Sequence, residues 1–316
     1  MKKILSTVLV GAMLTSMLAG CGGNTKAPET TAAATEKATT AAATEAATDA
    51  ATTEAAGDTA AAAEGTVKTP SGKFTVGFDQ EFPPMGFVGD DGQFTGFDLD
   101  LAKEVASRLG LEFVPQPINW DAKDMELDSG NIDCIWNGFT MNGRENDYTW
   151  TESYMDNSQV FVVKSDSGIK TQADLAGKIV EVQKESSAQS ALEENADNIA
   201  LRDSFSQLIE YADYNTAFMD LEAGAVDAVA MDIGVAKYQI EGKESKFIIL
   251  DEPIVKEQYA IGFYKGNTEM RDKVQKALDE MAADGTFKKI SEKWFGYDVC
   301  TLAAAKNANT SASDSN

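Results

Sequence analysis

The sequence contains no histidine, and this absence excludes several kinds of active site. A Ser-His-Asp or Cys-His nucleophile needs an imidazole, and so does a histidine metal site. The commonest proton carrier near neutral pH is missing as well. Any catalysis would therefore have to use carboxylate, lysine or tyrosine side chains, and we expect neither a cofactor nor a metal.

Positive charge is scarce too, because the 316 residues include 27 lysines and arginines against 51 aspartates and glutamates, a net charge of −24. Binding to nucleic acid requires a concentrated cationic surface, so nucleic acid is excluded as a partner. The sequence also lacks a Gly-x-x-x-x-Gly-Lys-Ser/Thr phosphate loop, which indicates that the chain does not hydrolyse nucleotides itself.

Long hydrophobic runs are rare. The run Ile4–Met17 is too short and too interrupted to span a membrane, and with two lysines before it residues 1–20 are typical of an export signal. The following Leu18–Cys21 looks like a lipobox, the processing site of bacterial lipoproteins, which implies cleavage before Cys21 and lipid on its sulfur. The alternative is an ordinary signal peptide with a chance cysteine.

The other two cysteines are Cys134 and Cys300. In an exported protein they could form a disulfide. Cys134, however, lies in an apolar segment predicted to be a strand, where a buried free thiol is common. Both possibilities remain open at this point.

Low-complexity segments flank the part of the chain that can fold. Residues 24–66 are mostly alanine and threonine with no aromatic side chain, so they cannot bury enough apolar surface to offset the entropy of ordering. We therefore expect residues 21–68 to be a lipid-bearing, disordered tether. Residues 301–316 have a similar composition, and we expect a disordered tail there.

Between these segments, strand and helix patterns alternate, which predicts an α/β fold with parallel sheets. Strands are predicted at 73–78, 112–114, 132–136, 159–163, 179–183, 227–231, 247–250 and 258–263. Helices are predicted at 98–108, 125–127, 187–195, 215–222, 235–241, 269–283 and 286–294. Two successive blocks of this kind indicate two Rossmann-like α/β lobes rather than one large sheet.

A series of short motifs occurs in order along this folded segment. They are Phe82–Phe87, Gly96–Leu101, Asn119–Asp121, Gly130–Asp133, Thr140–Arg144, Leu175–Lys178, Leu221–Ala228 and Lys293–Gly296. As an ordered set they resemble solute-binding protein family 3, the amino-acid-binding subunits of ABC importers, which have the type 2 periplasmic-binding-protein fold.

The resemblance implies two lobes joined by a two-strand hinge. Lobe 1 would comprise residues 69–164 and 257–300, and lobe 2 residues 165–256. The hinge strands would lie near 162–164 and 255–259. A ligand would bind between the lobes and be trapped when the hinge closes, because the closed form makes contacts that the open form lacks.

An α-amino acid requires a cation for its carboxylate and an acid for its ammonium group. By resemblance, Arg144 would bind the carboxylate, and Thr140 with the backbone of Gly138 would bond to the carboxylate or the amine. The segment Thr140–Arg144 is one residue shorter than the family pattern Thr-x-Thr-x-x-Arg, and Gly143 would let the loop turn sharply. The alternative is a surface arginine paired with a nearby acid.

In the second lobe, the resemblance places Gln183, Ser186 and Ser187 at the ligand, where a strand gives way to a helix. A serine there would also serve as helix N-cap. The family commonly has glycine where Glu185 stands. Asp232 matches the acid that holds the ammonium group, at the strand end where α/β folds bind ligands. A simple turn or N-cap aspartate is the alternative.

The ligand's side chain would meet a different set of residues. Phe82 and Trp120 match aromatic positions that enclose the aliphatic part of the ligand, and Trp136 either lies near them or belongs to the core. Hydrophobic packing is the alternative for all three. Asp79 matches a position that often meets a polar or cationic side chain, so a polar amino acid is favoured. Glutamine, a basic amino acid and cystine remain open.

These features predict the substrate-binding lipoprotein of an amino-acid ABC importer. It would be an extracytoplasmic monomer, anchored to the membrane by the lipid on Cys21 and delivering its ligand to permease subunits. The long tether favours the outer face of the plasma membrane of a single-membrane bacterium. The alternatives are an exported lyase like the cyclohexadienyl dehydratases, which share the fold, and an amino-acid sensor.

Overall fold

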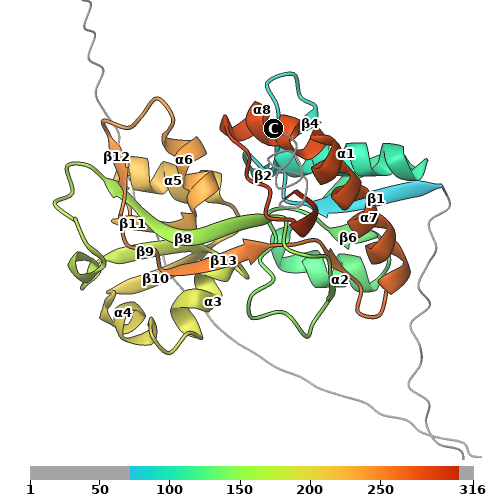
Figure 1. Ribbon diagram of the computed structural model, residues 1–316. Helices are drawn as coiled ribbons and strands as arrows, with labels where there is room; N and C mark the ends of the chain where they lie inside the picture. The colour runs from blue at the N-terminus through green and yellow to red at the C-terminus, as the bar shows by residue number, and fades with distance from the viewer. Residues whose placement is uncertain (1–71, 306–316) are drawn as a thin grey trace, which may run out of the picture. The chain divides into compact units, whose positions relative to one another are not determined.

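The computed structural model describes residues 72–305 (Figure 1). The predicted export signal (1–20), the lipidation of Cys21, the tether and the end of the chain from residue 306 lie outside the described residues. None of the helices within residues 72–305 combines the length and the apolar character needed to cross a membrane.

The first lobe is built on a five-stranded sheet in the order β5-β1-β6-β14-β7. The strands are β1 (Lys73–Phe78), β5 (Glu112–Pro117), β6 (Cys134–Ile135), β7 (Thr149–Trp150) and β14 (Gly262–Phe263). The helices are α1 (Phe97–Leu109), α2 (Lys123–Asp128), α7 (Thr268–Asp284) and α8 (Thr286–Phe295), with the 3-10 turn η1 (Trp120–Ala122). Strands β1, β5 and β6 are parallel, and β14 is antiparallel to both of its neighbours.

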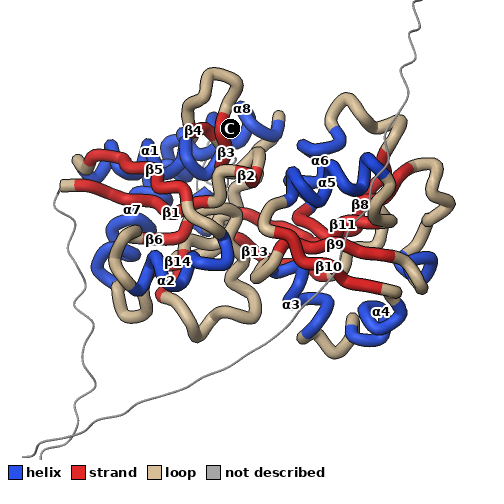
Figure 2. The backbone as a smooth tube through the Cα atoms, turned by 180° about the vertical axis from the view of Figure 1, so that it is seen from behind, coloured by secondary structure: helices blue, strands red, loops and turns tan. Residues whose placement is uncertain are grey.

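The second lobe is built on a six-stranded sheet in the order β10-β9-β11-β8-β12, with β13 also paired to β8. The strands are β8 (Met155–Lys164), β9 (Ile179–Gln183), β10 (Gln207–Tyr211), β11 (Ala228–Asp232), β12 (Phe247–Ile249) and β13 (Val255–Tyr259). The helices are α3 (Ser187–Glu193), α4 (Ile199–Ser204), α5 (Tyr214–Ala223) and α6 (Ile233–Ile240), with the 3-10 turn η2 (Gln172–Leu175). Figures 1 and 2 show α5 and α6 on one face of this sheet and α3 and α4 on the other.

A small antiparallel sheet precedes α1 in the first lobe. It contains β2 (Glu81–Phe82), β3 (Gly86–Val88) and β4 (Phe94–Thr95). Gly96 connects β4 to α1 with φ +147°, and a Cβ atom there would lie 2.1 Å from the carbonyl oxygen of Met85. Only glycine fits this close approach, which explains the glycine at the start of the motif Gly96–Leu101.

The chain passes between the two sheets twice. It leaves β7 and enters β8 through residues 151–154, and it returns from β13 to β14 through residues 260 and 261. Strands β8 and β13 pair with each other, and β8 also pairs with β11 and β12. Residues 155–164 and 255–259 therefore share the second sheet, although we expected the first crossing nearer residue 164. A hinge motion at these crossings stays a prediction.

Most of the predicted strands and helices are present, with ends shifted by a few residues. The predicted strand 258–263 is instead the end of β13 and the start of β14, which belong to different sheets. The sheets are mixed rather than purely parallel, because β8 enters the second sheet without a crossover helix and runs antiparallel to β11. Helix α4, strand β10 and the short strands β2, β3, β4 and β7 had not been predicted.

The chain beyond residue 300 differs from expectation. The side chain of Leu302 is fully buried, and Thr301 bonds through its backbone N–H to the carbonyl of Tyr154 at 3.1 Å. The disordered tail predicted to start at residue 301 is therefore wrong for its first residues, since Leu302 packs in an apolar site that composition alone does not reveal.

Cys134 is a free, buried thiol, and burial raises its pKa well above the usual value.

Candidate functional site

A cluster of polar side chains lies on one face of the second sheet because of strand register. Glu257 in β13 stands opposite Asn157 in β8, and Asp232 in β11 stands opposite Gln159 in β8. Asn157 and Gln159 are two residues apart in one strand, so their side chains point to the same face. Tyr259 follows Glu257 by two residues and shares that face.

Hydrogen bonds join these side chains into what we call the acidic network. Its members are Asp232, Glu257, Asn157, Gln159 and Tyr259, together with the hydroxyl groups of Thr140 and Ser187. The Asn157 amide nitrogen donates to Asp232 and to Glu257, at 2.7 Å each. The Gln159 amide nitrogen also donates to both acids, at 2.7 and 2.8 Å, and the Tyr259 hydroxyl donates to Asp232 at 2.5 Å.

The network connects the two lobes through Glu257. The Thr140 hydroxyl, from the first lobe, donates to Glu257 Oε1 at 2.7 Å. The Ser187 hydroxyl, from the first residue of α3, donates to the same carboxylate at 3.0 Å. Burial, and next the charge of Glu257, raise the pKa of Asp232 to about 7. An added cation would relieve this unfavourable burial of negative charge.

A small cavity of about 10 Å³ lies beside the network, with room for about one water molecule. Nine of the ten residues that line it were predicted from the sequence. These are Phe82, Trp120, Gly138, Thr140, Arg144, Gln183, Ser186, Ser187 and Asp232, and the tenth is Asn137. The structure therefore brings the predicted set together from both lobes.

Arg144 reaches the cavity from a tight turn of the first lobe. The turn is closed by a bond from the Arg144 backbone N–H to the carbonyl of Met141 at 3.0 Å, and Gly143 within it has φ +81°. The guanidinium donates to the carbonyl oxygens of Thr140 and Glu185, at 3.2 Å each, and lies 5.4 Å from the ring centroid of Phe139. The shortened motif thus still directs Arg144 into the space between the lobes.

The predicted side-chain end of the site is also assembled. The Gln183 amide donates to Asp79 Oδ2 at 2.7 Å, which places Asp79 directly behind the cavity lining. Burial raises the pKa of Asp79. The ring of Phe82 packs against Tyr214 of the second lobe at 5.8 Å. Trp136 is fully buried beside Tyr154, so the core alternative is correct for this residue.

Ser186 has the role of helix cap that we had considered for it. Its hydroxyl accepts from the backbone N–H of Gln189 at 3.2 Å, at the start of α3. Asp232 occupies the corresponding position before α6 but makes no side-chain cap bond to that helix. Its oxygen is engaged in the acidic network instead.

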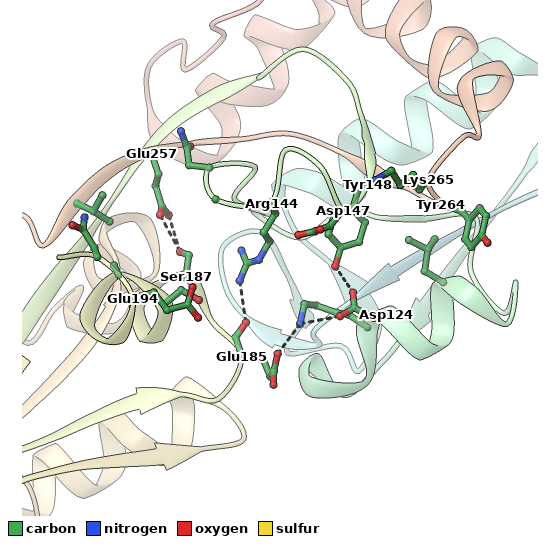
Figure 3. Close-up of a pocket in the computed structure, with 18 of the residues that line it drawn as sticks. Asp124, Arg144, Asp147, Tyr148, Glu185, Ser187, Glu194, Glu257, Tyr264 and Lys265 are labelled. Carbon is green, nitrogen blue, oxygen red and sulfur yellow. Dashed lines mark hydrogen bonds and ion pairs between the residues drawn. The ribbon is translucent and has the colours of Figure 1, made fainter. Parts of the chain in front are cut away.

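A larger open cleft of about 760 Å³ adjoins the cavity, and Arg144 and Ser187 line both (Figure 3). Its walls come from α2, the loop 142–148, α3, β13 and the residues after β14. Six of its lining residues are acidic: Asp124, Asp128, Asp147, Glu185, Glu194 and Glu257.

Within residues 72–305, no group of three acidic or cysteine side chains is arranged to hold a metal ion.

Glu185 forms a second connection between the lobes, which we call the clasp. Its carbonyl accepts from Trp120 Nε1 and from Arg144, at 3.2 Å each, and its carboxylate lies 3.7 Å from Lys123 Nζ (Figure 3). Beside it, Lys184 pairs with Asp121 at 3.2 Å. Glu185 has φ +61°, a left-handed conformation that favours glycine.

Asp98, which we had not predicted as a site residue, supports the cavity from behind. It is fully buried at the start of α1, and it accepts from the backbone N–H of Gly138 at 2.5 Å and from the Tyr154 hydroxyl at 2.9 Å. Burial raises its pKa to about 7. Asp98 thereby fixes the loop that supplies Gly138 and Thr140 to the cavity.

Asn157, Gln159, Glu257 and Tyr259 had not been predicted either. The signal for two of them was present, since Asn157 and Gln159 are polar residues at alternate positions just before the apolar run Val160–Val163. The predicted strand that starts at Gln159 leaves out Asn157, and the hinge strand implied at 255–259 contains Glu257 without giving its side chain a role.

Comparison with known proteins places this geometry in a family. The model of the bacterial extracellular solute-binding proteins, family 3, matches residues 74–297. The L-cystine-binding protein TcyJ of Escherichia coli is 33% identical over 231 residues, which cover 72% of this chain and 84% of that protein. The histidine-binding periplasmic protein of Salmonella typhimurium is 30% identical over 239 residues, 72% of this chain and 89% of the other.

Solved structures show the same fold. An ABC uptake transporter substrate-binding protein from Streptococcus pneumoniae, solved with bound histidine, matches with a TM-score of 0.69 and 36% identity, covering 73% of this chain and 95% of that one. These relatives are named as binding proteins rather than enzymes. The two lobes, their order along the chain and the family match lead to one conclusion: this protein is a member of family 3 of the bacterial extracellular solute-binding proteins, with the type 2 periplasmic-binding-protein fold.

Proposed function

We propose that this protein captures an amino acid between its two lobes and delivers it to an ABC importer. The observation that carries the proposal is that Arg144 and Asp232, a fixed cation and a buried acid, line one cavity at the junction of the lobes. A free amino acid carries a carboxylate and an ammonium group a short distance apart. One charged side chain of each sign is the minimal complement to that pair.

Each side chain has a distinct role in this proposal. Arg144 binds the ligand carboxylate, and Asp232 binds the ammonium group. Phe82 and Trp120 enclose the aliphatic part of the ligand. Asp79 and Gln183 meet its distal end, and because they are a buried acid and an amide, a polar or cationic side chain is preferred over an aliphatic one.

Relatives named for cystine, histidine and arginine support this polar ligand class. The sequence alone favoured glutamine, a basic amino acid or cystine, and these remain the candidates. Histidine joins them because an imidazole N–H can donate to the carboxylate of Asp79.

Capture requires the lobes to move. The cavity of about 10 Å³ is far smaller than any amino acid, so a ligand enters only when the lobes separate. Hydrogen bonds from Trp120 and Thr140 to second-lobe residues hold the closed arrangement. We infer that the chain bends at its two crossings, residues 151–154 and 260–261, and closes around the ligand.

The N-terminal features complete the proposal. A lipid on Cys21 anchors a monomer to the outer face of the plasma membrane, and residues 21–68 tether the lobes at a distance from it. The lobe surfaces then dock on membrane permease subunits, and the ATPase belongs to a separate chain.

A thermal-shift screen against the twenty amino acids, cystine and ornithine tests amino-acid binding directly. A ligand at 100 times its dissociation constant stabilises the folded protein by about 2.7 kcal/mol. We expect the largest shift from a polar or basic amino acid or from cystine, and a much smaller shift from the same ligand in Arg144→Ala. A flat response across the whole set contradicts the proposal.

A further inference from the structure

The hydroxyl groups of Thr140 and Ser187 are the subject of this inference, which rests on the proposed function. Both face the cavity, and either could in principle donate a hydrogen bond to the ligand or accept one. A hydroxyl has a single proton, however. If a protein group accepts the hydrogen bond from this proton, the hydroxyl oxygen can only accept a hydrogen bond from the ligand.

Glu257 accepts the hydrogen bonds of both hydroxyl groups. Its carboxylate accepts from Thr140 Oγ1 at 2.7 Å, a shorter bond than the 3.3 Å from Thr140 Oγ1 to Ser187 Oγ, and from Ser187 Oγ at 3.0 and 3.1 Å. The side chain of Glu257 is only 2% exposed, so water does not compete for these bonds. Ser187 also accepts a bond of 2.8 Å from the Gln159 amide.

The side-chain amides of Asn157 and Gln159 also already donate to protein acceptors. The two protons of the Asn157 amide are directed at Asp232 and Glu257. The two protons of the Gln159 amide are shared among Ser187, Asp232 and Glu257. This end of the cavity therefore presents lone pairs and negative charge, and it has little left to donate.

We propose that Glu257 is the specificity-determining residue that makes this end of the cavity recognise an ammonium group. Because Glu257 accepts the hydrogen bonds of the Thr140 and Ser187 hydroxyls, their oxygens can only accept hydrogen bonds from the ligand, beside the carboxylate of Asp232. A primary ammonium, with three N–H donors and a positive charge, satisfies such a surface. An α-hydroxyl group of the same size, with one donor and no charge, does not.

The proposal also assigns the two ends of the ligand. The carboxylate lies at Arg144, and the hydroxyls of Thr140 and Ser187 face the ammonium group instead of the carboxylate. Glu257 itself acts through these hydroxyls and through its charge. It was not among the residues predicted from the sequence.

The experiment compares amino acids with their α-hydroxy analogues. The pairs are L-arginine with argininic acid, L-histidine with imidazolelactic acid, and L-cystine with 3,3′-dithiobis(2-hydroxypropanoic acid). Calorimetry gives the ratio of dissociation constants within a pair. Since a hydrogen bond to a charged group contributes about 1.5–3 kcal/mol, we expect the wild-type protein to prefer the amino acid by about 10- to 150-fold.

Glu257→Gln is the decisive variant, because it keeps the shape of the side chain but has a single acceptor oxygen for four donors. At least one hydroxyl can then donate towards the cavity. We expect the amino acid to bind about 10- to 100-fold more weakly and the hydroxy analogue to change by less than about threefold. Glu257→Asp, which retains the charge, should recover part of the preference.

Glu181→Gln is the matched control. Glu181 is a fully buried acid in β9 of the same lobe and is not among the residues lining the cavity, so its removal reproduces the loss of buried charge alone. We expect it to leave the ratio at the wild-type value. An equal loss of affinity for both members of a pair in Glu257→Gln, or an equal change in Glu181→Gln, overturns the role assigned to Glu257.

The wild-type measurement decides the matter even if the variants do not fold. A wild-type protein that binds an amino acid and its hydroxy analogue equally well overturns the role of Glu257 and leaves amino-acid binding in place. A wild-type protein that binds neither member of any pair, and none of the screened amino acids, overturns both proposals.

Discussion

The acidic network and the clasp both connect the two lobes, but they differ in burial. In the network, Asp232, Glu257, Asn157, Gln159 and Thr140 are each less than 9% exposed. In the clasp, the side chain of Glu185 is 53% exposed although that of its partner Lys123 is only 3% exposed, and the neighbouring pair of Lys184 and Asp121 is 48% and 46% exposed. The first connection lies inside the protein, whereas in the second the carboxylate of Glu185 is exposed and its partner Lys123 is buried.

When the lobes close, the protein both selects its ligand and holds the lobes together, and the difference in burial assigns these two functions to different connections. Charges buried in the network are costly unless they are paired, so their partners determine which ligand can be enclosed. Exposed ion pairs contribute about 0–1 kcal/mol each and discriminate little. We therefore expect the network to set what is bound, and the clasp to adjust how firmly the lobes stay together.

The largest effect is expected from Asp232→Asn. Removing the acid from a buried charge pair with the ligand ammonium costs about 2–5 kcal/mol, a loss of affinity of about 30-fold or more. The free protein should be no less stable, because the raised pKa shows that the ionised form is disfavoured there. Calorimetry with L-arginine, L-histidine and L-cystine measures the affinity. Asp251→Asn, at an exposed position of the same lobe, is the control and should bind normally.

A smaller effect is expected from a pair of glycine substitutions. A Cβ atom on Gly138, inside the network's cavity, would lie 3.0 Å from the ring of Tyr259 and 3.1 Å from that of Phe82. A Cβ atom on Gly143, in the open cleft, would meet nothing within 4 Å. Both residues have positive φ, so both alanines carry a similar backbone cost.

Gly138→Ala adds overpacking to that backbone cost, so it should destabilise the protein by about 1–3 kcal/mol more than Gly143→Ala. Urea unfolding followed by circular dichroism measures the difference. Equal destabilisation by the two substitutions would show that the rings of Tyr259 and Phe82 move aside at little cost, which would contradict a rigid network around the cavity.

A polar residue that ends an apolar strand could be predicted from the sequence, whereas the contact between polar residues of two distant strands could not. Asp232 and Gln183 each end a strand, where a polar residue after an apolar run is visible and the family motifs add support. Asn157 and Glu257 lie within strands about a hundred residues apart in sequence. Their contact depends on the register between β8 and β13, and a single sequence does not specify which strands pair or how they are aligned.

Glu185 shows a second limit of sequence reasoning. Because the family commonly has glycine at this position, the glutamate had left a close backbone approach there in doubt. The structure instead retains the left-handed conformation that glycine allows, and the carbonyl of Glu185 still reaches Trp120 and Arg144. Its partner Lys123 lies on a different lobe, so the compensating ion pair could not be seen from spacing alone.

The buried acids predict an unusual dependence of stability on pH. Asp98 and Asp232 have their pKa raised to about 7 in the folded protein, against about 3.9 in an unfolded chain. Between these values the folded state holds protons that the unfolded state has released, so stability falls as the pH rises from about 4 through 7. Since the sequence has no histidine, side chains of that type do not obscure the effect.

Urea midpoints at pH 5 and pH 8 test this directly, and we expect the ligand-free protein to be the more resistant at pH 5. Asp232→Asn should show a smaller fall between the two values, whereas a clasp variant such as Glu185→Gln should fall as the wild type does. Exposed acids whose pKa is lowered, such as Asp174 and Glu269, affect stability only at more acidic pH. A midpoint that rises from pH 5 to pH 8 contradicts the prediction.

The smallest effect is expected from the clasp, where two substitutions of Glu185 separate charge from backbone strain. Glu185→Gln removes the ion pair with Lys123 and keeps the left-handed residue, so ligand should bind about two- to fivefold more weakly. This difference should shrink without vanishing at about 1 M salt, because salt screens the exposed carboxylate of Glu185 better than the buried ammonium of Lys123. Glu185→Gly loses the same pair but adopts positive φ without strain, so it should weaken binding to the same extent while raising the unfolding temperature. Stopped-flow dissociation rates and thermal unfolding measure the two quantities. If Glu185→Gln instead weakened binding as strongly as Asp232→Asn, the clasp would share in ligand recognition, and the division of roles between the two connections would be wrong.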